Sequence, residues 1–163
     1  MTTSALLGFA LALAIATDAF GESPSTVVYE VSALRAHSYY PDLDQFDERD
    51  LLSGGLALRN TIIGEGDARA ASSVSLVVVQ VSGPEFTPSV RGSIELQALI
   101  EGGHELLRSS VPFMHLFSAK QQISVPFLVW GTGCGELTLK AKVDVEGKNA
   151  HSRTAVIGFR CGE

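Results

Sequence analysis

The clearest alternation of apolar and polar residues lies near the end of the chain, in residues 136–145. Five apolar positions alternate there with polar or charged ones, and they are Leu137, Leu139, Ala141, Val143 and Val145. Successive side chains of a strand point to opposite faces of the sheet, so this pattern predicts a strand with one buried and one solvated face. Residues 146–149 form a turn-forming cluster, and residues 154–160 read as the returning strand.

The two cysteines of the chain flank this predicted hairpin. The midpoint between Cys134 and Cys161 lies between Gly147 and Lys148, inside the predicted turn. Opposite positions in an antiparallel pair are equidistant from the turn, so the sequence predicts a Cys134–Cys161 disulfide at the open end of the hairpin. Such a bond closes a loop of about 28 residues and stabilises the fold by roughly 3 kcal/mol.

The register of the hairpin is not fully consistent with that bond. In an antiparallel hairpin the residue numbers of each pair add up to a constant. That constant must be 296 if Ala155, Ile157 and Phe159 are to share a face with Leu137 and Leu139, whereas the two cysteine numbers add up to 295. A bulge or bend at one of the neighbouring glycines, Gly133 or Gly135, is therefore expected to absorb the mismatch.

Six further strands are predicted upstream, at residues 26–35, 56–63, 73–82, 90–100, 105–111 and 122–130. The strand at 73–82 is apolar on both faces and is expected to be central, whereas Pro126 indicates that strand 122–130 lies at an edge or contains a bulge. Residues 40–55 are a polar, acidic interruption, predicted as a long loop or as one short helix from Asp42 to Gly54. Residues 112–118 are a connection with room for a short edge strand.

Strands separated by glycine- and proline-marked turns predict an all-β fold, an antiparallel β-sandwich of about seven or eight strands, immunoglobulin-like in outline. The resemblance is one of architecture alone. Trp130 precedes both cysteines, and Phe159 stands where an antibody domain has tyrosine. The predicted disulfide links one hairpin rather than two sheets.

The N-terminus has the form of a secretory signal peptide. Residues 5–16 are uncharged and apolar, and small residues follow at Thr17-Asp18-Ala19 and Ala19-Phe20-Gly21. The sequence thus predicts a signal segment at 1–21 and a single sandwich domain at 22–163. The residues before the apolar run contain no Lys or Arg, so an uncleaved anchor or N-terminal helix is the alternative. Export predicts a periplasmic or secreted protein, in which two cysteines favour a disulfide.

The charge of the chain excludes several classes of ligand. Its net charge is −6 at pH 7, and the basic residues do not cluster. Binding to nucleic acid or to anionic lipid requires clustered Lys and Arg, so neither is expected, and membrane contact is expected only through an uncleaved N-terminal segment.

The acidic run from Asp42 to Asp50 is a candidate calcium site. Asp42 and Asp44 match the first two ligand positions of a calcium-binding loop, but Phe46 occupies the third, and Asp47 occupies the place of the required glycine. A solvated acidic loop is the preferred interpretation, and no metal or cofactor is expected.

Cys134 lies in a glycine-rich turn, a position from which a cysteine can act as a nucleophile. The flanking positions of a nucleophile elbow hold Thr132 and Glu136 instead of glycine. A structural cystine is preferred, and no catalytic residue is predicted.

One aromatic and acidic cluster is a candidate binding patch, formed by Tyr39, Tyr40, Asp42, Asp44 and Phe46. Such side chains suit a protein interface, but they also suit a plug at the end of a sandwich.

The expected function is therefore that of an exported, non-enzymatic binding, accessory or assembly component of a cell-envelope complex, whose partner is another envelope or surface protein. A small periplasmic enzyme using Cys134 and a calcium-dependent adhesion module using residues 42–50 are the alternatives. An incompletely paired edge in 112–128 is expected to recruit a partner strand.

Overall fold

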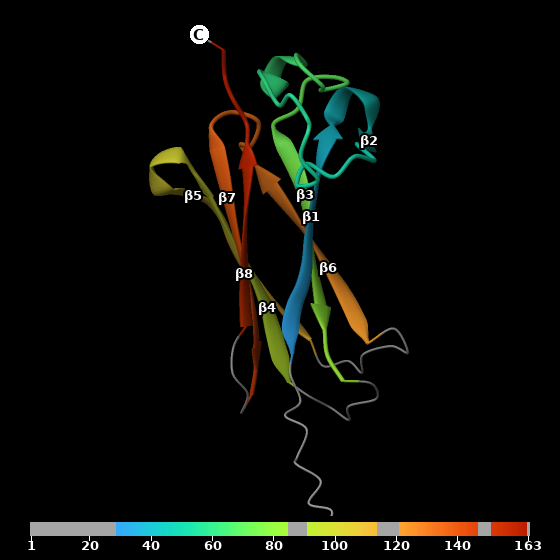
Figure 1. Ribbon diagram of the computed structural model, residues 1–163, viewed down its shortest axis with the longest axis vertical. Coiled ribbons are helices and arrows are strands. Elements are labelled where there is room, and N and C mark those ends of the chain that lie inside the picture. The colour runs from blue at the N-terminus through green and yellow to red at the C-terminus, as the bar shows by residue number, and fades with distance from the viewer. Residues whose placement is uncertain (1–28, 85–90, 114–120, 147–150, 163) are drawn as a thin grey trace, which may run out of the picture.

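The protein is a sandwich of two antiparallel sheets in the computed structural model, which describes residues 29–84, 91–113, 121–146 and 151–162. The first sheet has the order β2-β1-β3-β6, and its strands are β1 (Glu30–Tyr40), β2 (Gln45–Phe46), β3 (Val74–Ser82) and β6 (Gln122–Trp130). The second sheet has the order β5-β4-β7-β8, and its strands are β4 (Gly92–Ile100), β5 (His104–Phe113), β7 (Glu136–Val145) and β8 (His151–Gly158). The all-β sandwich predicted from the sequence is confirmed (Figure 1).

The core lies between the two sheets and follows the alternation seen in the sequence. The inward side chains of the two central pairs of strands are almost fully buried, among them Val77, Val79, Val81, Ile94, Leu96, Leu137 and Leu139. Burying an aliphatic side chain of this size contributes about 1.5–3 kcal/mol, so these positions dominate the stability of the fold. The prediction of a central strand at 73–82 is confirmed, because β3 lies between β1 and β6.

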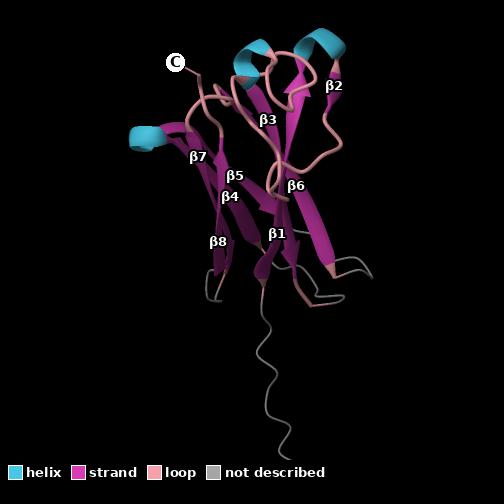
Figure 2. Cartoon of the chain, turned by 45° about the horizontal axis from the view of Figure 1, so that its top comes forward, coloured by secondary structure: helices cyan, strands magenta, loops and turns pink. Residues whose placement is uncertain are grey.

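Three short 3₁₀ helices lie at one end of the sandwich, η1 (Pro41–Leu43), η2 (Thr61–Ile63) and η3 (Glu101–Gly103) (Figure 2). At that end the loop after β2 joins the two sheets. Its Leu51 amide donates to the Ala36 carbonyl of β1, and its Leu58 carbonyl accepts from the amide of Arg160, beyond β8. No helix within the described residues has the length and apolarity that a membrane crossing requires.

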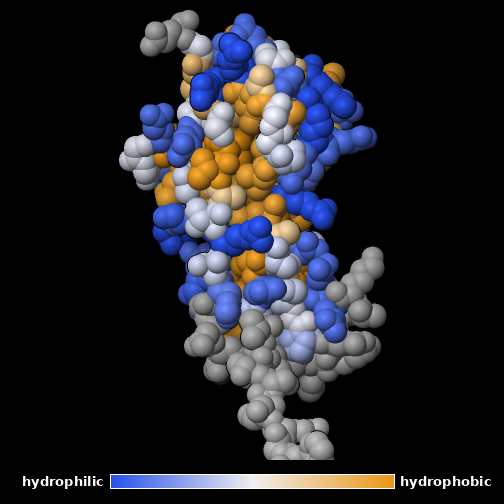
Figure 3. Space-filling view, viewed as in Figure 1, coloured by the Kyte–Doolittle hydropathy of each residue, from blue (hydrophilic) through white to orange (hydrophobic). Residues whose placement is uncertain are grey.

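The seam between β1 and β8 shows how the core is closed at the side. Figure 3 shows apolar side chains gathering between these strands, below the loops of the upper end. Leu52, Leu56 and Ala155 are half-buried and pack against the core. The Arg153 guanidinium of β8 donates to the Ser32 carbonyl of β1 at 2.6 Å, which ties the two edges together.

One predicted strand was wrong, and the end of another was misplaced. Residues 56–63 do not form a ladder strand, because Asn60 adopts a left-handed backbone (φ 44°) and Thr61–Ile63 form η2. Only an isolated parallel bridge from Arg59 to Arg160 remains. The first strand, predicted at 26–35, is confirmed over residues 30–35, but it ends later than predicted. Because β1 continues to Tyr40, the interruption predicted at 40–55 begins with η1 and is otherwise loop apart from the two-residue β2. Of its two predicted forms, the long loop is therefore the better description.

The C-terminal hairpin is confirmed, with a corrected register. Leu137 pairs with Ile157 and Leu139 with Ala155, so the paired numbers sum to 294 rather than 296. The shift of two residues keeps the same side chains on the inner face. The returning strand runs from His151 to Gly158, and Phe159 is buried just beyond it.

The disulfide between Cys134 and Cys161 is also confirmed, with a Cα–Cα distance of 5.1 Å. Gly133 (φ 101°) and Gly135 (φ 73°), the two glycines at which a bend was expected, both bend the chain beside it. The one-residue mismatch of the cysteines is with the observed sum of 294 rather than with 296. The signal segment at 1–21, the predicted turn residues 147–149 and most of the 112–118 connection lie outside the described residues.

Candidate functional site

The predicted aromatic patch divides between the surface and the core. Tyr39 and Phe46 are paired across β1 and β2, and their ring centroids lie 4.9 Å apart. The Tyr39 hydroxyl donates to Asp44 Oδ1 at 2.8 Å. This hydrogen bond to a carboxylate raises the pKa of Tyr39. Phe46 is 43% exposed, so this pair forms a surface feature, whereas Asp42 lies exposed nearby in η1 without a role in the ring contact.

Tyr40 points to the opposite face of β1 and is 1% exposed. Its hydroxyl donates to Asp47 Oδ2 at 2.7 Å and accepts from the Arg69 amide at 3.2 Å. Burial, together with the hydrogen bond to Asp47, raises the pKa of Tyr40. Tyr40 is therefore buried and hydrogen-bonded at this end of the sandwich and does not belong to an exposed patch.

Two carboxylates of the acidic run hold the loop to the sheet. Asp47 is 2% exposed and forms a bidentate pair with Arg49, whose guanidinium holds the pKa of this carboxyl well below its usual range. Asp50 Oδ1 accepts from the Ala36 and Leu52 amides, each at 3.0 Å. Among the described residues, no group of three or more His, Cys, Asp or Glu side chains is arranged to hold a metal ion.

A row of four aromatic and aliphatic residues crosses the outer face of the first sheet. Phe46 pairs with Tyr39, Tyr39 with Val74, and Val74 with Trp130, one residue from each of β2, β1, β3 and β6. Cross-strand partners project from the same face, and this is the solvent face because the alternate residues point into the core. Trp130 is 64% exposed, while Val74 between its neighbours is almost completely covered.

Two more rows continue this surface along the strands. The second row consists of His37, Leu76 and Leu128, and the third consists of Arg35, Val78 and Pro126. Leu128 is 45% exposed, Pro126 is exposed, and Leu76 and Val78 are half-buried. We call this surface the outer apolar face, comprising Phe46, Tyr39, Val74, Trp130, Leu76, Leu128, Val78 and Pro126.

Charges border the outer apolar face on the β1 side. Arg35 is exposed at one end, and Asp42 and Asp44 are exposed at the other. None of these three forms a salt bridge within the described residues. The His37 ring lies between them, with Nδ1 3.0 Å from the Asp47 carbonyl oxygen and 3.1 Å from that of Arg49.

Sequence reasoning found only the Tyr39 and Phe46 end of this face. For strand 122–130 the sequence pattern predicted only the apolar face that points into the core, and Phe127 and Val129 of that face are buried. The signal that was missed is on the other face of the same strand. Leu128 and Trp130 are apolar there, although the outward positions of a strand are normally polar.

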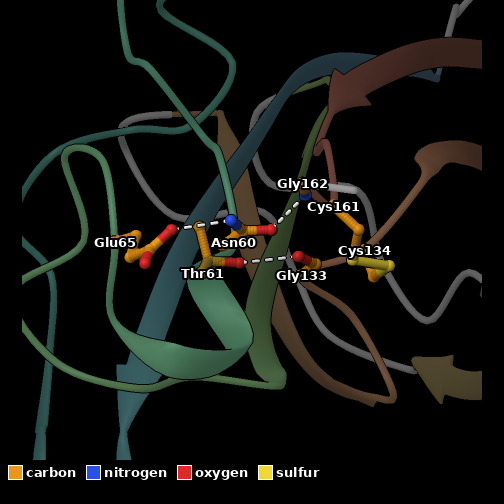
Figure 4. Close-up of a disulfide and its surroundings, with 7 residues drawn as sticks. All are labelled: Asn60, Thr61, Glu65, Gly133, Cys134, Cys161 and Gly162. Atoms are coloured by element: carbon orange, nitrogen blue, oxygen red, sulfur yellow. Dashed lines mark hydrogen bonds between the residues drawn. A yellow bond between two sulfur atoms is a disulfide. The ribbon is translucent and has the colours of Figure 1, made fainter.

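The disulfide end of the sandwich does not present a reactive thiol. Both cysteines are in the cystine, and Thr61 Oγ1 donates to the Gly133 carbonyl at 2.9 Å beside it (Figure 4). The Gly162 amide donates to the Asn60 side chain, which also donates to Glu65 at 2.6 Å. These contacts fasten the C-terminal residues to the loop that contains η2.

An open cavity of about 470 Å³ adjoins the cystine and is lined in part by Glu101, Gly135 and Arg160. A second open cavity, of about 570 Å³, shares Glu101 and Arg160 with the first, and Glu136 and Lys140 also line it. No buried side-chain polar atom within the described residues lacks a hydrogen-bond partner. The cavities therefore contain charged groups of both signs but no buried group left for a ligand.

Comparison with known proteins adds little. No protein-family model matches the chain, and no curated protein gives a significant match. A crystal structure of a protein assigned as a beta-galactosidase from Bacteroides fragilis shares 14% identity with this chain at a TM-score of 0.41. The match covers 53% of this chain and 14% of that protein, and likeness of this extent carries no argument about function.

Proposed function

We propose that the protein is an exported, non-enzymatic binding or assembly component of a cell-envelope complex, and that it binds a protein partner through the outer apolar face. The observation that carries this proposal is the exposure of Trp130 (64%) and Leu128 (45%) on a sheet face whose first row is apolar or aromatic on all four strands and whose next two rows are apolar on β3 and β6. Tryptophan and tyrosine are enriched among the residues that dominate binding energy at protein interfaces. Contiguous apolar surface of this kind is typical of interaction sites rather than of free surface.

The electrostatics of the described residues support a non-enzymatic role. Each group with a shifted pKa belongs to a structural contact: Tyr40, Asp47 and Arg49 in the loop after β2, Tyr39 beside Asp44, and Glu105 beside Gln97 and Arg108. An active site instead places shifted groups in a cleft, near a nucleophile or an acid–base partner. The shifted groups of the described residues lie instead in contacts that hold loops and strands together, which supports a binding role.

Export to the periplasm or the outside of the cell is part of the proposal. The cystine supports an oxidising compartment, and residues 1–21 have the form of a signal peptide. The intact mass of the native protein tests this. We expect a mass lower by about twenty residues, since signal peptides of 15–30 residues are removed on export. A full-length mass would instead favour the uncleaved N-terminal helix.

We further propose that the sandwich is immunoglobulin-like in outline. In such domains the first, second and fifth strands share one sheet, and the third, sixth and seventh share the other. Taking β1, β3, β4, β6, β7 and β8 as A, B, C, E, F and G reproduces that division, and β5 then adds to the edge beside C. The cystine differs in position, because it links the ends of the hairpin formed by β7 and β8.

Affinity capture from the native envelope tests the proposed function. Trp130→Ser removes the largest exposed apolar side chain of the face and is expected to abolish capture of the partner. Val156→Ser is the matched control, because Val156 is 49% exposed on the outer face of the other sheet. Equal capture by the wild type and Trp130→Ser would reject the outer apolar face as the binding site.

A further inference from the structure

We infer that the outer apolar face binds a second copy of this chain, with the twofold axis running across the strands through the row of His37, Leu76 and Leu128. This inference rests on the proposed function, because it names the partner of the same face. It follows from the arrangement of the three rows, which are self-complementary under that rotation.

The rotation places each row on a suitable partner row. An axis across the strands keeps each strand opposite the same strand of the second copy but reverses its direction. Trp130 then lies over Pro126, and Val74 lies over Val78, because these residues occupy the first and third rows of the same strands. The central Leu76 and Leu128 lie near their own copies. Apolar groups therefore meet apolar groups along β3 and β6, and the indole of Trp130 covers a proline ring.

The charges select this axis over its alternative. On β1, the rotation carries Arg35 toward the opposite end of the face, where Tyr39, Asp42 and Asp44 lie. Arg35 can there pair with a carboxylate and stack on the Tyr39 ring. An axis parallel to the strands would instead carry Arg35 toward Pro126 on β6, away from any carboxylate of the face. Only the first arrangement gives the exposed Arg35 an acidic partner, and symmetry makes that contact twice.

The size of the face suits a reversible dimer. Large aromatic side chains present about 150–250 Å² each, so the exposed fractions of Trp130, Phe46 and their neighbours amount to roughly 500 Å² in each copy. Two such faces bury about 1,000 Å², at the lower limit for a specific interface. We therefore expect association in the micromolar range rather than an obligate dimer.

The edge of the same sheet is a poorer docking site than its face. β6 is an edge strand, but Pro126 lies in its middle and cannot donate a backbone hydrogen bond to an added strand. Docking through the face leaves the edge unpaired. Hydrogen exchange in β6 distinguishes the two arrangements, because an added strand would protect edge amides that face-to-face packing leaves open.

Sedimentation equilibrium of the purified protein between about 1 and 200 µM tests the inference, since that range brackets micromolar association. We expect a monomer–dimer equilibrium, weakened at least tenfold by Trp130→Ser and unchanged by Val156→Ser, since interface tryptophans carry a large share of binding energy. Arg35→Glu is expected to weaken the dimer by repulsion from Asp42 and Asp44. Adding Asp42→Lys to Arg35→Glu should restore much of the association, because the crossed pair becomes attractive again. Melting curves check that each variant remains folded.

The outcomes separate this inference from the proposed function. A protein that stays monomeric at 200 µM, while Trp130→Ser abolishes envelope capture, overturns the second copy and leaves the proposed function standing. A dimer unaffected by Trp130→Ser, with unchanged capture, overturns both. If the dimer depends on Trp130 and yet fails to re-form when Asp42→Lys is added to Arg35→Glu, that result overturns the stated axis. New hydrogen-exchange protection of the β6 edge also overturns it.

Discussion

The guanidinium of Arg49 and the carboxylate of Asp47 form a bidentate pair two residues apart, with Nη2–Oδ2 at 2.6 Å and Nε–Oδ1 at 3.0 Å. Asp47 is buried, Arg49 is partly exposed, and the Tyr40 hydroxyl donates to the same carboxylate. Arg49 also donates to the Asp67 carbonyl at 2.5 Å. The pair therefore joins β1, the loop after β2 and the segment after η2.

Acid should weaken the fold through Asp47. The pKa of Asp47 in the folded state lies well below the unfolded value near 3.9, because Arg49 stabilises the ionised form. Between these two values the unfolded chain binds more protons, so the free energy of unfolding falls as the pH drops below about 4. Above that range the contribution is fully present. We expect denaturant unfolding at a series of pH values to show this decline.

Asp47→Asn should lower the free energy of unfolding by about 2–4 kcal/mol near pH 7, since it leaves Arg49 and Tyr40 with a weaker acceptor. The same substitution should flatten the decline below pH 4. Asp42→Asn is the control, because Asp42 is an exposed carboxylate in η1, on the other side of β2. An unchanged acid profile in Asp47→Asn would contradict the role assigned to this pair.

The parts of the fold that were predictable are those in which local pattern and tertiary packing agree. In β7, Leu137 and Leu139 alternate with polar residues and pack inward, as their positions indicated. In residues 56–63 a less regular alternation, with Asn60 between Leu58 and Ile62, did not produce a strand. Thr61 is buried there, and its hydroxyl donates to the carbonyl of Gly133, 72 positions away, a contact that no local pattern contains.

The candidate site was partly predictable for a similar reason. The sequence places Tyr39 and Tyr40 side by side, but only the position of β1 in the sheet decides which of them faces solvent. Trp130 joins Tyr39 on one surface because β3 lies between their strands. Such lateral neighbours depend on the strand order, which the sequence pattern does not specify.

The cystine should stabilise the end of the chain without determining the fold. Beyond β8, Phe159 is buried, the Arg160 amide donates to Leu58, and the Asn60 amide donates to the Arg160 carbonyl at 2.7 Å. The bond joins residues 27 positions apart and holds these contacts together. Replacing both cysteines by serine should lower the free energy of unfolding by about 2–4 kcal/mol and leave the sandwich intact. Chemical denaturation and a circular dichroism spectrum check this, and a non-reducing peptide map verifies the link in the wild type.

Gly133 should be far less tolerant of a side chain than Gly103. Both have a left-handed backbone, with φ of 101° and 79°. A Cβ at Gly133 would lie 2.6 Å from Thr61 Oγ1 and 2.8 Å from the Ser72 carbonyl oxygen, whereas one at Gly103 would meet nothing within 4 Å. Gly103→Ala should therefore cost only the backbone penalty, about 1–2 kcal/mol, and Gly133→Ala should cost more because η2 and residue 72 must move. Thermal melting of the two variants compares them, and equal losses would show that the steric contact is unimportant.

Ser75 and Thr132 form a buried pair of hydroxyls whose energetics can be isolated. Both are nearly inaccessible to solvent, and their oxygens lie 2.9 Å apart, joining β3 to the turn after β6. Thr132→Val keeps the shape of the side chain but removes the partner of Ser75. A buried hydroxyl left without a partner costs about 1–3 kcal/mol, so this variant, like Ser75→Ala alone, should be destabilised.

In the double variant no hydroxyl of this pair is left without its partner, and its stability should exceed the value expected from adding the two single losses. A double-mutant cycle by urea denaturation measures the difference. Simple additivity of the two substitutions would show that the hydroxyls do not interact, because residues in direct contact normally couple by about 0.5–3 kcal/mol.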